Sequence, residues 1–223
     1  MSNILISGCG ISFSKQEKPS WVKILRLCGV PTIDVGGPAV SNEWILNNLI
    51  NGIVKYDPSH VICQLTGTGK LDIESNDERY NELVSTDSIR NFTYKNIWPS
   101  SASADHKVKQ DYYKWIYSKS IDIDNTAVKL FALQEICSKH NIKLHIVQGY
   151  KINWDQHQLV KLINFDKNFT IEEYYHASSY YQFHDHSNDN TVPCKQFMKH
   201  FAQKINDEFL HFDIQSKLDK FND

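Results

Sequence analysis

The chain has 223 residues, of which 41% are hydrophobic and 22% are charged, so it is long enough and apolar enough to bury a full core. This composition excludes disorder as the default state. A formal net charge of −2 and the lack of a dense Lys/Arg block give no support to nucleic acid or an anionic membrane surface as a partner.

The first predicted element is a short buried strand that starts near residue 3 and ends in a glycine turn. Its apolar run Ile4-Leu5-Ile6 carries no charge, which is typical of the central strand of a sheet. Gly8 and Gly10 follow, and glycines let backbone amides come close to a bound group. Ligands of open α/β sheets bind at the carboxyl ends of the strands. The turn after this strand is therefore a candidate site.

The next segments alternate helix and strand. Ser20 precedes a helix that Gly29 is placed to end, and a second strand follows over 31–35. Ser41 or Asn42 then caps a second helix. The apolar faces of these helices comprise Trp21, Ile24, Leu25 and Cys28 in the first, and Trp44, Ile45, Leu49 and Ile53 in the second. This alternation predicts βαβ units and a mainly parallel sheet.

The rest of the chain combines further strands and helices with two long irregular stretches. Strands are expected over 60–66 and 143–147. Helices are expected over about 107–118 and over 125–139, the second with Asn125 or Thr126 as its cap. A last helix begins near Pro193, and its apolar face comprises Phe197, Phe201, Ile205 and Phe209. The stretches at about 72–105 and 150–190 lack sustained periodicity. The first of them is predicted to be a lid or a specificity loop. We expect one domain over 1–223, with both stretches as insertions.

The cysteines indicate the redox state of the chain. The five of them, at positions 9, 28, 63, 137 and 194, are scattered and lie mostly in apolar runs, which predicts reduced thiols and no disulfide framework. No signal-peptide pattern precedes the first strand, and no apolar stretch reaches the roughly 18 residues of a membrane span. We expect a soluble, cytoplasmic protein with no membrane partner.

Two glycine motifs suggest nucleotide binding, and both are incomplete. Gly67-Thr68-Gly69-Lys70 lacks the earlier glycine and the following Ser/Thr of a phosphate-binding loop, because Gln64 and Leu71 stand at those positions. Gly8-Cys9-Gly10 lacks the third glycine of a dinucleotide fingerprint, because Phe13 follows it. An ordinary strand-to-loop turn is the favoured interpretation of each, so no nucleotide cofactor is expected.

His184-Asp185-His186 is a candidate metal motif, with His176 and Cys194 nearby. The His-x-His spacing puts both imidazoles on one side of an extended segment, but no third and fourth ligand follow at a recognised spacing. Surface or hydrogen-bonded histidines are therefore the favoured interpretation, and we expect no bound metal.

A hydrolase needs a nucleophile, donors for an oxyanion and a base. The first turn offers Ser7, Cys9, Ser12 and Ser14 as nucleophiles. Donors are available at the next two strand ends, from Gly36 to Asn42 and from Thr66 to Thr68, and Asp185 and His186 precede the last helix. Each feature alone is weak, since serine and glycine are common in turns and a lone histidine is more often structural.

Taken in order, these segments resemble the SGNH/GDSL hydrolase superfamily, and specifically its small members from phage and viral genomes. Residues 4–14 resemble the first block of that family, and residues 34–42 resemble the second, which forms the oxyanion hole. Residues 61–66 lie where the third block lies, and His186-Ser187-Asn188 takes the place of the terminal Asp and His motif. The middle of the phage proteins is matched by Trp98-Pro99-Ser100-Ser101 and Leu133-Gln134. The resemblance implies a three-layer α/β/α sandwich with a mainly parallel sheet, an SGNH-hydrolase, flavodoxin-like architecture.

Several signature side chains of the family are altered here. Gly10 stands where the family has its serine, which removes the nucleophilic oxygen but keeps a backbone N–H. Ala39 replaces a glycine of the second block, and Gln64 or Thr66 is the nearest polar substitute for the asparagine of the third. His184 stands where an aspartate is expected, with Asp185 next to it.

The resemblance implies hydrolysis of an ester, such as an acyl or acetyl group on a glycan, without a cofactor. In that mechanism His186 is the general base, Asp185 orients it and Ser12 is the substitute nucleophile. Gly10, Ala39, Asn42 and Thr66 would hold the oxyanion or the substrate. Two explanations of Gly10 stay open: a neighbour, Ser12 or Cys9, takes over from the lost serine, or residue 10 is a replacement of serine in this sequence.

A second hypothesis treats the chain as a non-catalytic descendant of the same family. It would keep the cleft and the aromatic loops and serve as a carbohydrate-binding or structural accessory protein. Gly10 and His184 motivate this hypothesis. Under either hypothesis, a phage or viral origin implies an infected host cell or a virion as the place of action.

Overall fold

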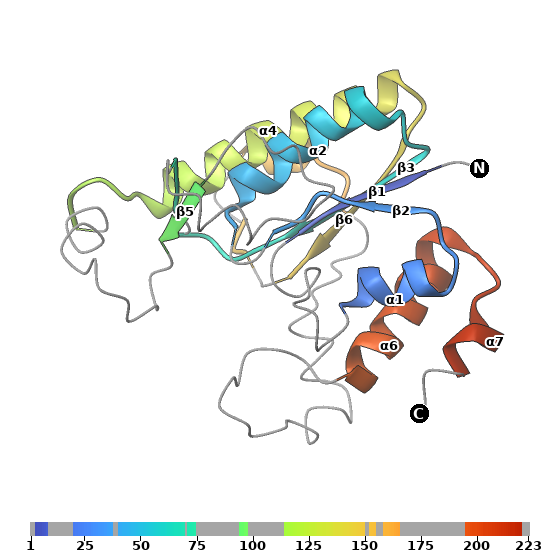
Figure 1. Ribbon diagram of the computed structural model, residues 1–223. Coiled ribbons are helices and arrows are strands. Elements are labelled where there is room, and N and C mark those ends of the chain that lie inside the picture. Colours follow the sequence, from blue (N-terminus) through green and yellow to red (C-terminus); the bar gives the residue numbers. More distant parts are fainter. Residues whose placement is uncertain are drawn as a thin grey trace.

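A four-stranded parallel sheet lies at the centre of the protein. The computed structural model describes residues 3–8, 20–37, 40–69, 71–74, 94–97, 114–149, 152–154, 158–165 and 195–219. The sheet has the order β2-β1-β3-β6 and consists of β1 (Ile4–Ser7), β2 (Thr32–Asp34), β3 (His60–Leu65) and β6 (Lys143–Gln148) (Figure 1). All its pairings are parallel. Counted within this sheet alone the order is 2-1-3-4, as in flavodoxin-like folds. The predicted fold class is confirmed.

Helices cover both faces of the sheet. The helices α2 (Asn42–Tyr56) and α4 (Lys119–Lys139) lie on one face, and α1 (Trp21–Leu27) and α6 (Lys195–Ile205) lie on the other (Figure 1). Successive strand side chains point to opposite faces, so Leu5 packs in the core with α2 and α4 while Ile4 and Ile6 pack in the core with α1 and α6. A strand buried on both faces needs a continuous apolar run, and Ile4-Leu5-Ile6 of β1 is such a run. The molecule therefore has three layers.

The ends of the first two helices agree with the sequence. The Ser20 hydroxyl accepts a hydrogen bond from the Lys23 N–H at 3.2 Å and caps α1, and Gly29 follows its end at φ +87°. Of the two candidates for the second cap it is Ser41 that acts, accepting from the Trp44 N–H at 3.1 Å. Asn42 is thereby free for another role.

The prediction for α4 was wrong at its start. The helix begins at Lys119 and not at residue 125, and Ser118 caps it by accepting from the Ile121 N–H at 3.4 Å. Thr126 is buried inside the helix, where its hydroxyl donates to the Asp122 carbonyl at 2.8 Å. A threonine that satisfies its hydroxyl in this way fits a helix interior, so it marks no cap here.

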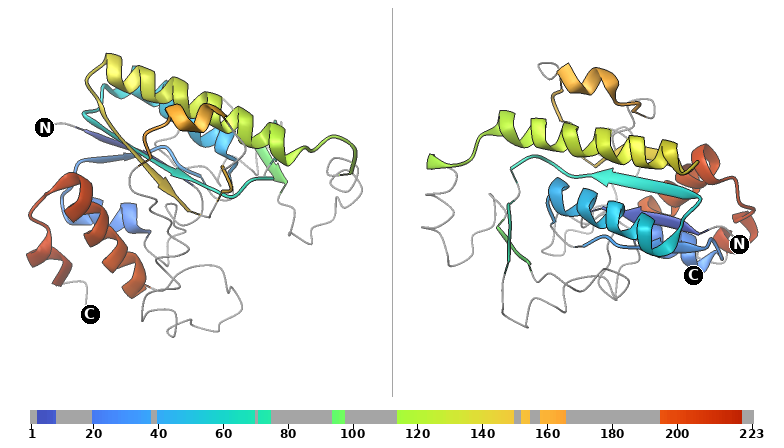
Figure 2. Two further views of the ribbon diagram at one scale, coloured as in Figure 1. Left: turned by 180° about the vertical axis from the view of Figure 1, so that it is seen from behind. Right: turned by 90° about the horizontal axis from the view of Figure 1, so that it is seen from above.

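The two stretches expected to be irregular contain short regular elements. The strands β4 (Leu71–Glu74) and β5 (Tyr94–Ile97) pair antiparallel in a separate sheet. The 3₁₀ helix η2 (Gln158–Leu162) lies against α4 (Figure 2), where the Gln134 amide donates to the Leu162 carbonyl at 3.0 Å and accepts from the Asn164 N–H at 2.8 Å.

The carboxyl-terminal region continues the layer formed by α1. Phe197, Phe201 and Ile205 of α6 are fully buried, as the four-residue spacing predicted. The π-helical segment η4 (Asn206–Leu210) extends α6, and the short helix α7 (Gln215–Leu218) follows. The Lys217 ammonium donates to the Cys28 carbonyl at 2.9 Å and so ties α7 to the end of α1.

Cys28, Cys63 and Cys137 are buried free thiols, as expected, and burial raises the pKa of Cys137 to about 11. Cys9 and Cys194 lie outside the described residues.

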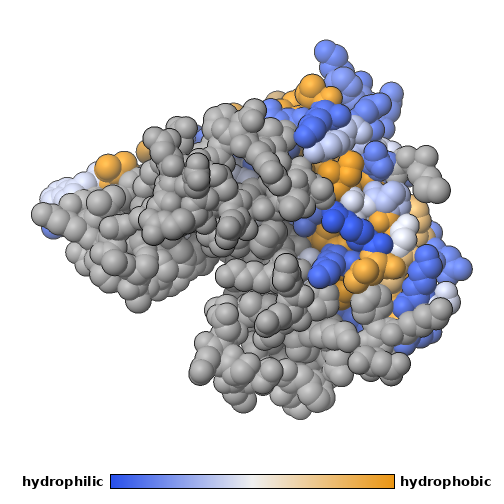
Figure 3. All heavy atoms as spheres, in the orientation of Figure 1, coloured by the Kyte–Doolittle hydropathy of each residue, from blue (hydrophilic) through white to orange (hydrophobic). Residues whose placement is uncertain are grey.

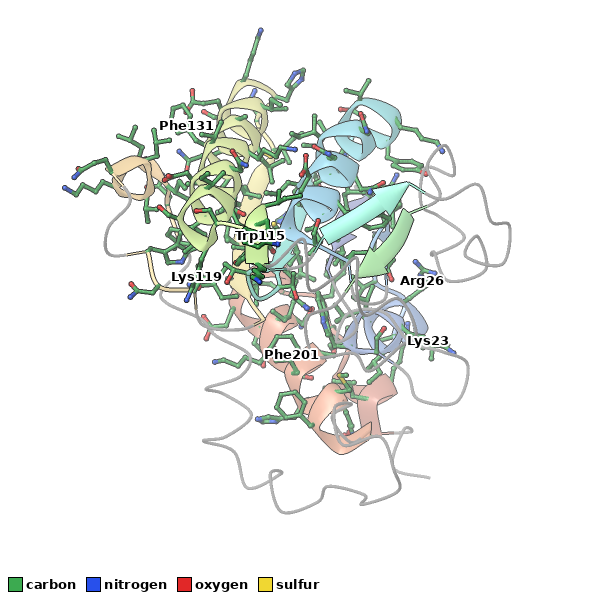
Figure 4. All side chains as sticks on the ribbon, turned by 90° about the vertical axis from the view of Figure 1, so that its left-hand side faces the viewer. Lys23, Arg26, Trp115, Lys119, Phe131 and Phe201 are labelled. Carbon is green, nitrogen blue, oxygen red and sulfur yellow. The ribbon has the colours of Figure 1, made fainter. Side chains whose placement is uncertain are left out.

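Figure 3 shows one face of the molecule. Where the described side chains reach this face, hydrophobic and hydrophilic residues are mixed. Of the helix predicted over 107–118, only residues 114–118 are described. Trp115 and Ile116 there are each 72% exposed, and Trp115 precedes α4, which begins at Lys119 (Figure 4). Within the described residues, no helix combines the length and the apolar character that a membrane crossing needs.

Candidate functional site

The candidate site lies at the carboxyl ends of β1, β2 and β3. From β1 the chain passes through α1 to β2 on one side, whereas from β3 it continues toward β6 on the other. The strand order therefore reverses between β1 and β3, and ligands of open α/β sheets bind at such a switch point. The residues that follow these strands are the ones that the sequence singled out.

The ends of β1 and β2 approach each other very closely. The Gly37 N–H donates to the Gly8 carbonyl at 3.1 Å, and the Val35 N–H donates to the Ile6 carbonyl at 2.8 Å. A Cβ atom at Gly36 would lie 2.9 Å from the Gly8 carbonyl oxygen, which is too close for any side chain. Glycine at position 36 is therefore required by backbone contact.

Ser7 is the one candidate nucleophile of the first turn that lies within the described residues. It is fully buried, and its hydroxyl donates to the Val35 carbonyl at 3.3 Å. The Ser7 hydroxyl thus links β1 to β2. This contact argues against a role for Ser7 in attacking a substrate.

Asn42 and Thr66 form a paired contact between α2 and the end of β3. The Asn42 side-chain oxygen accepts from the Thr66 N–H at 2.7 Å, and its Nδ2 donates to the Thr66 carbonyl at 3.1 Å. Asn42 is 3% exposed and Thr66 is fully buried. The Asn42 side-chain amide bonds to both the N–H and the carbonyl of Thr66, as the backbone of a neighbouring strand would. It therefore holds the backbone in place where β3 ends. Two residues that the resemblance placed in one site are brought together here.

The hydroxyl of Thr66 is unusual. Within the part of the chain that the structure describes, no hydrogen-bond partner is found for Thr66 Oγ1, although the atom is buried. A buried polar group without a partner costs about 1–3 kcal/mol. Such groups are rare in native proteins, and each calls for a functional or structural reason.

Gln64 was the other sequence candidate for the third-block position. Its side-chain oxygen accepts from the Trp21 indole N–H at 3.0 Å, and both residues are fully buried. Gln64 therefore joins β3 to α1 in the interior. The contact favours Thr66 over Gln64 as the polar group of the site.

Asp122 adds a contact that sequence reasoning missed. Its Oδ2 accepts from the Gly69 N–H at 2.7 Å, in the turn after β3 where Gly69 has φ +85°. Burial raises the pKa of Asp122, and nearby Glu43 raises it further, while hydrogen bonds from Gly69 and Tyr117 oppose the rise. The prediction that α4 starts at residue 125 had left Asp122 outside any element.

The remaining predicted site residues lie outside the described residues. These are Gly10, Ser12, Ala39, Asp185 and His186, together with Cys9, Ser14, His176, His184 and Cys194 of the alternative nucleophile and metal hypotheses. Their roles stay predictions. Among the described residues, no group of three or more His, Cys, Asp or Glu side chains is arranged to hold a metal ion.

No protein-family model matches this sequence, and no curated protein matches it. Among solved structures, the fold is similar to the psychrotrophic esterase EstA from Pseudoalteromonas sp., with 13% sequence identity, a TM-score of 0.49, and coverage of 95% of this chain and 100% of that chain. It is also similar to a GDSL-like lipase from Bacteroides thetaiotaomicron, with 11% identity, a TM-score of 0.48, and coverage of 93% of this chain and 87% of that chain. At these identities and TM-scores, the similarities assign neither a family nor an activity to this chain.

Proposed function

We propose that this chain is a hydrolase of the SGNH/GDSL type that cleaves an ester, such as an acyl or acetyl group on a glycan. The observation that carries the proposal is the paired contact between Asn42 and Thr66 at the switch point of a flavodoxin-like sheet. Asn42 belongs to the segment that resembles the second block of the family, and Thr66 belongs to the segment that resembles the third. A phage or viral origin and a cytoplasmic location belong to the same proposal.

The contact determines which donors Asn42 and Thr66 have left for a substrate. A side-chain amide carries two N–H hydrogens, and the Thr66 carbonyl takes one of them from Asn42. The Thr66 backbone N–H is already donated to Asn42. The donors available to an oxyanion are therefore the second amide hydrogen of Asn42 and the Thr66 hydroxyl. Gly10 and Ala39 would add their backbone N–H groups.

In the proposed mechanism, Ser12 Oγ attacks the ester carbonyl carbon while His186 takes the serine proton. Asp185 orients the imidazole, and the donors stabilise the negative charge that develops on the carbonyl oxygen. His186 then gives its proton to the departing alcohol, which leaves an acyl group on Ser12. A water molecule that His186 deprotonates hydrolyses this acyl group and releases the acid.

The test is hydrolysis of p-nitrophenyl acetate and of an acetylated oligosaccharide by the purified chain. Ser12→Ala and His186→Ala should each lower turnover by orders of magnitude, because they remove the proposed nucleophile and the proposed base. Two matched controls should keep full activity: Ser14→Ala, and His140→Ala at the exposed end of α4. A wild-type chain without activity, or activity unchanged by His186→Ala, contradicts the proposal.

A second candidate function is carbohydrate binding without catalysis. The observation that favours it is Gly10, which lacks the hydroxyl of the family's serine. This candidate predicts that the chain binds an acetylated glycan without consuming it, and that Gly10→Ser creates no esterase. Ester turnover that Gly10→Ser raises severalfold would contradict it.

A further inference from the structure

We propose that Asp122 is a positioning residue of this site, which holds the turn after β3 in place through the Gly69 N–H. The proposal deepens the hydrolase function and rests on it for its effect on catalysis. The contact itself, a hydrogen bond of 2.7 Å from Gly69 to the Asp122 carboxylate, does not depend on that function.

The turn from Thr66 to Gly69 is fastened at both ends. At its start, the Asn42 side chain from the beginning of α2 pairs with both backbone groups of Thr66. At its end, Asp122 from the first turn of α4 accepts from Gly69. The two helices lie side by side on the same face of the sheet (Figure 1). The turn that carries the unpartnered Thr66 hydroxyl is thus held by two side chains from neighbouring helices.

Because the turn ends in a glycine, Gly69, it needs the second fixing contact, which is the hydrogen bond to Asp122. Its φ of +85° lies in the left-handed region, where glycine is free to adopt many other conformations as well. A flexible residue at the end of a turn gives little stiffness of its own. A charge-assisted hydrogen bond is roughly twice as strong as a neutral one, so the Asp122 carboxylate supplies the stiffness that glycine lacks.

The charges around Asp122 make this anchor sensitive to pH. Glu43 faces it from α2, and Tyr117 donates a hydrogen bond from the segment before α4. The Lys129 ammonium is engaged with Glu43 at 2.7 Å and with the Asn47 side-chain oxygen at 3.0 Å. Because burial and Glu43 raise the pKa of Asp122, its carboxyl gains a proton at a higher pH than an ordinary aspartate does. Protonation weakens the bond to Gly69, so the turn loosens as the pH falls.

A purely structural role is the competing explanation. An aspartate in the first turn of a helix stabilises that helix through the helix dipole, without any effect on the β3 turn. Asp124 is exposed and lies two residues further along α4, so it is the comparison residue for a general effect of negative charge near the start of the helix. Such a general effect would act through both residues, whereas the hydrogen bond from Gly69 is made to Asp122.

The decisive measurement is the Gly69 amide in ¹⁵N-edited NMR spectra recorded over a pH series. In the wild-type chain, the Gly69 amide proton shift should follow a titration with a midpoint above that of an ordinary aspartate. Asp122→Asn keeps an oxygen that accepts from Gly69 but cannot titrate, so the shift should become independent of pH. Asp122→Ala should speed deuterium exchange of the Gly69 amide by about 10-fold or more, because it removes a hydrogen bond to a charged group. Asp124→Ala should change neither quantity.

Activity supplies the second readout. Asp122→Ala should lower kcat by about 10- to 100-fold, which is the scale of losses caused by a misplaced active-site group. Asp122→Asn should recover most of the rate at neutral pH, and the acidic fall caused by protonation of the proposed base His186 should remain. Full kcat in a folded Asp122→Ala chain overturns the positioning role.

The two proposals fail in distinguishable ways. A Gly69 shift that does not titrate in the wild type, or unchanged exchange in Asp122→Ala, overturns the anchor whatever the chain catalyses. A wild-type chain without ester hydrolysis overturns the proposed function, and the Gly69 amide alone then decides whether Asp122 holds the turn.

Discussion

The imidazole rings of His60 and His145 stack on each other across β3 and β6, with centroids 5.7 Å apart and an angle of 16° between the ring planes. Both rings lie on the face covered by α6 and η4, where the Phe209 ring stacks on His145 at 4.4 Å. The pair lies near the amino ends of the two strands, whereas the candidate site lies at the carboxyl ends of the strands. Two imidazoles in this arrangement cannot both carry a proton without repulsion.

This stack predicts that the protein loses stability in mild acid. Burial lowers the pKa of His60, and the charges of His145, Lys143 and His211 lower it further, so the unfolded chain binds more protons than the folded chain just below about pH 6.5. The free energy of unfolding should therefore fall as the pH drops through that value. His60→Gln should reduce the difference between urea midpoints measured at neutral and mildly acidic pH. His140→Gln, at an exposed position, should leave the difference unchanged, and an equal difference in wild type and His60→Gln would contradict the prediction.

Asn42→Ala is predicted to destabilise the fold strongly. The substitution leaves the buried N–H and carbonyl of Thr66 without partners, and each such group costs about 1–3 kcal/mol. Urea unfolding with the linear extrapolation method measures the loss. Asn51→Ala, an exposed asparagine of the same helix, should stay within about 0.5 kcal/mol of wild type. If the two alanine variants unfolded at the same urea concentration, the pairing of Asn42 with Thr66 would carry no stability.

Thr66→Val is predicted to separate stability from function. Valine has nearly the shape of threonine, and it removes a buried hydroxyl for which no partner is found, so the free energy of unfolding should rise by about 1 kcal/mol. The same change should lower kcat by about 100- to 1,000-fold if the hydroxyl stabilises an oxyanion. Thr66→Ser, which keeps the hydroxyl, should retain most of the activity. A Thr66→Val chain that is less stable but fully active would refute both parts.

Ser7→Ala is predicted to affect stability alone. The Ser7 hydroxyl donates to the Val35 carbonyl inside the sheet, and removal of such a hydrogen bond costs about 1 kcal/mol. The initial rate of ester hydrolysis should match that of the wild type, in contrast to the loss expected for Ser12→Ala. A Ser7→Ala chain that folds but has lost all turnover would identify Ser7 as the nucleophile.

Much of the fold could be predicted because its determinants are local. The apolar runs of β1 and β3 reflect burial on two faces, and Ser20 and Gly29 delimit α1 through contacts with their own neighbours. The start of α4 could not be located in this way, because Ser118 and Thr126 are both plausible caps by residue type. Their difference depends on where each hydroxyl bonds once the helix exists.

The candidate site was predictable in its location but less so in its contacts. Glycines and small polar residues after strands point to the carboxyl edge of a parallel sheet, and Asn42 and Thr66 lie in segments that this pattern singled out. Their pairing joins residues 24 positions apart, and the bond between Gly69 and Asp122 joins residues 53 apart. No periodicity or local motif encodes contacts of this range, because they arise only when α2, α4 and β3 pack together.

The layer beneath the sheet also has a consequence for how the protein is made. Trp21 of α1 packs edge-on against Phe201 of α6 at 5.6 Å, and both lie in the core that covers Ile4 and Ile6. During translation α1 is the first helix made for this layer, so the face of β1 that carries Ile4 and Ile6 is not fully covered until α6 has been made as well. Apolar side chains of this layer are therefore exposed in the incomplete chain, and transiently exposed apolar surface of this kind promotes aggregation.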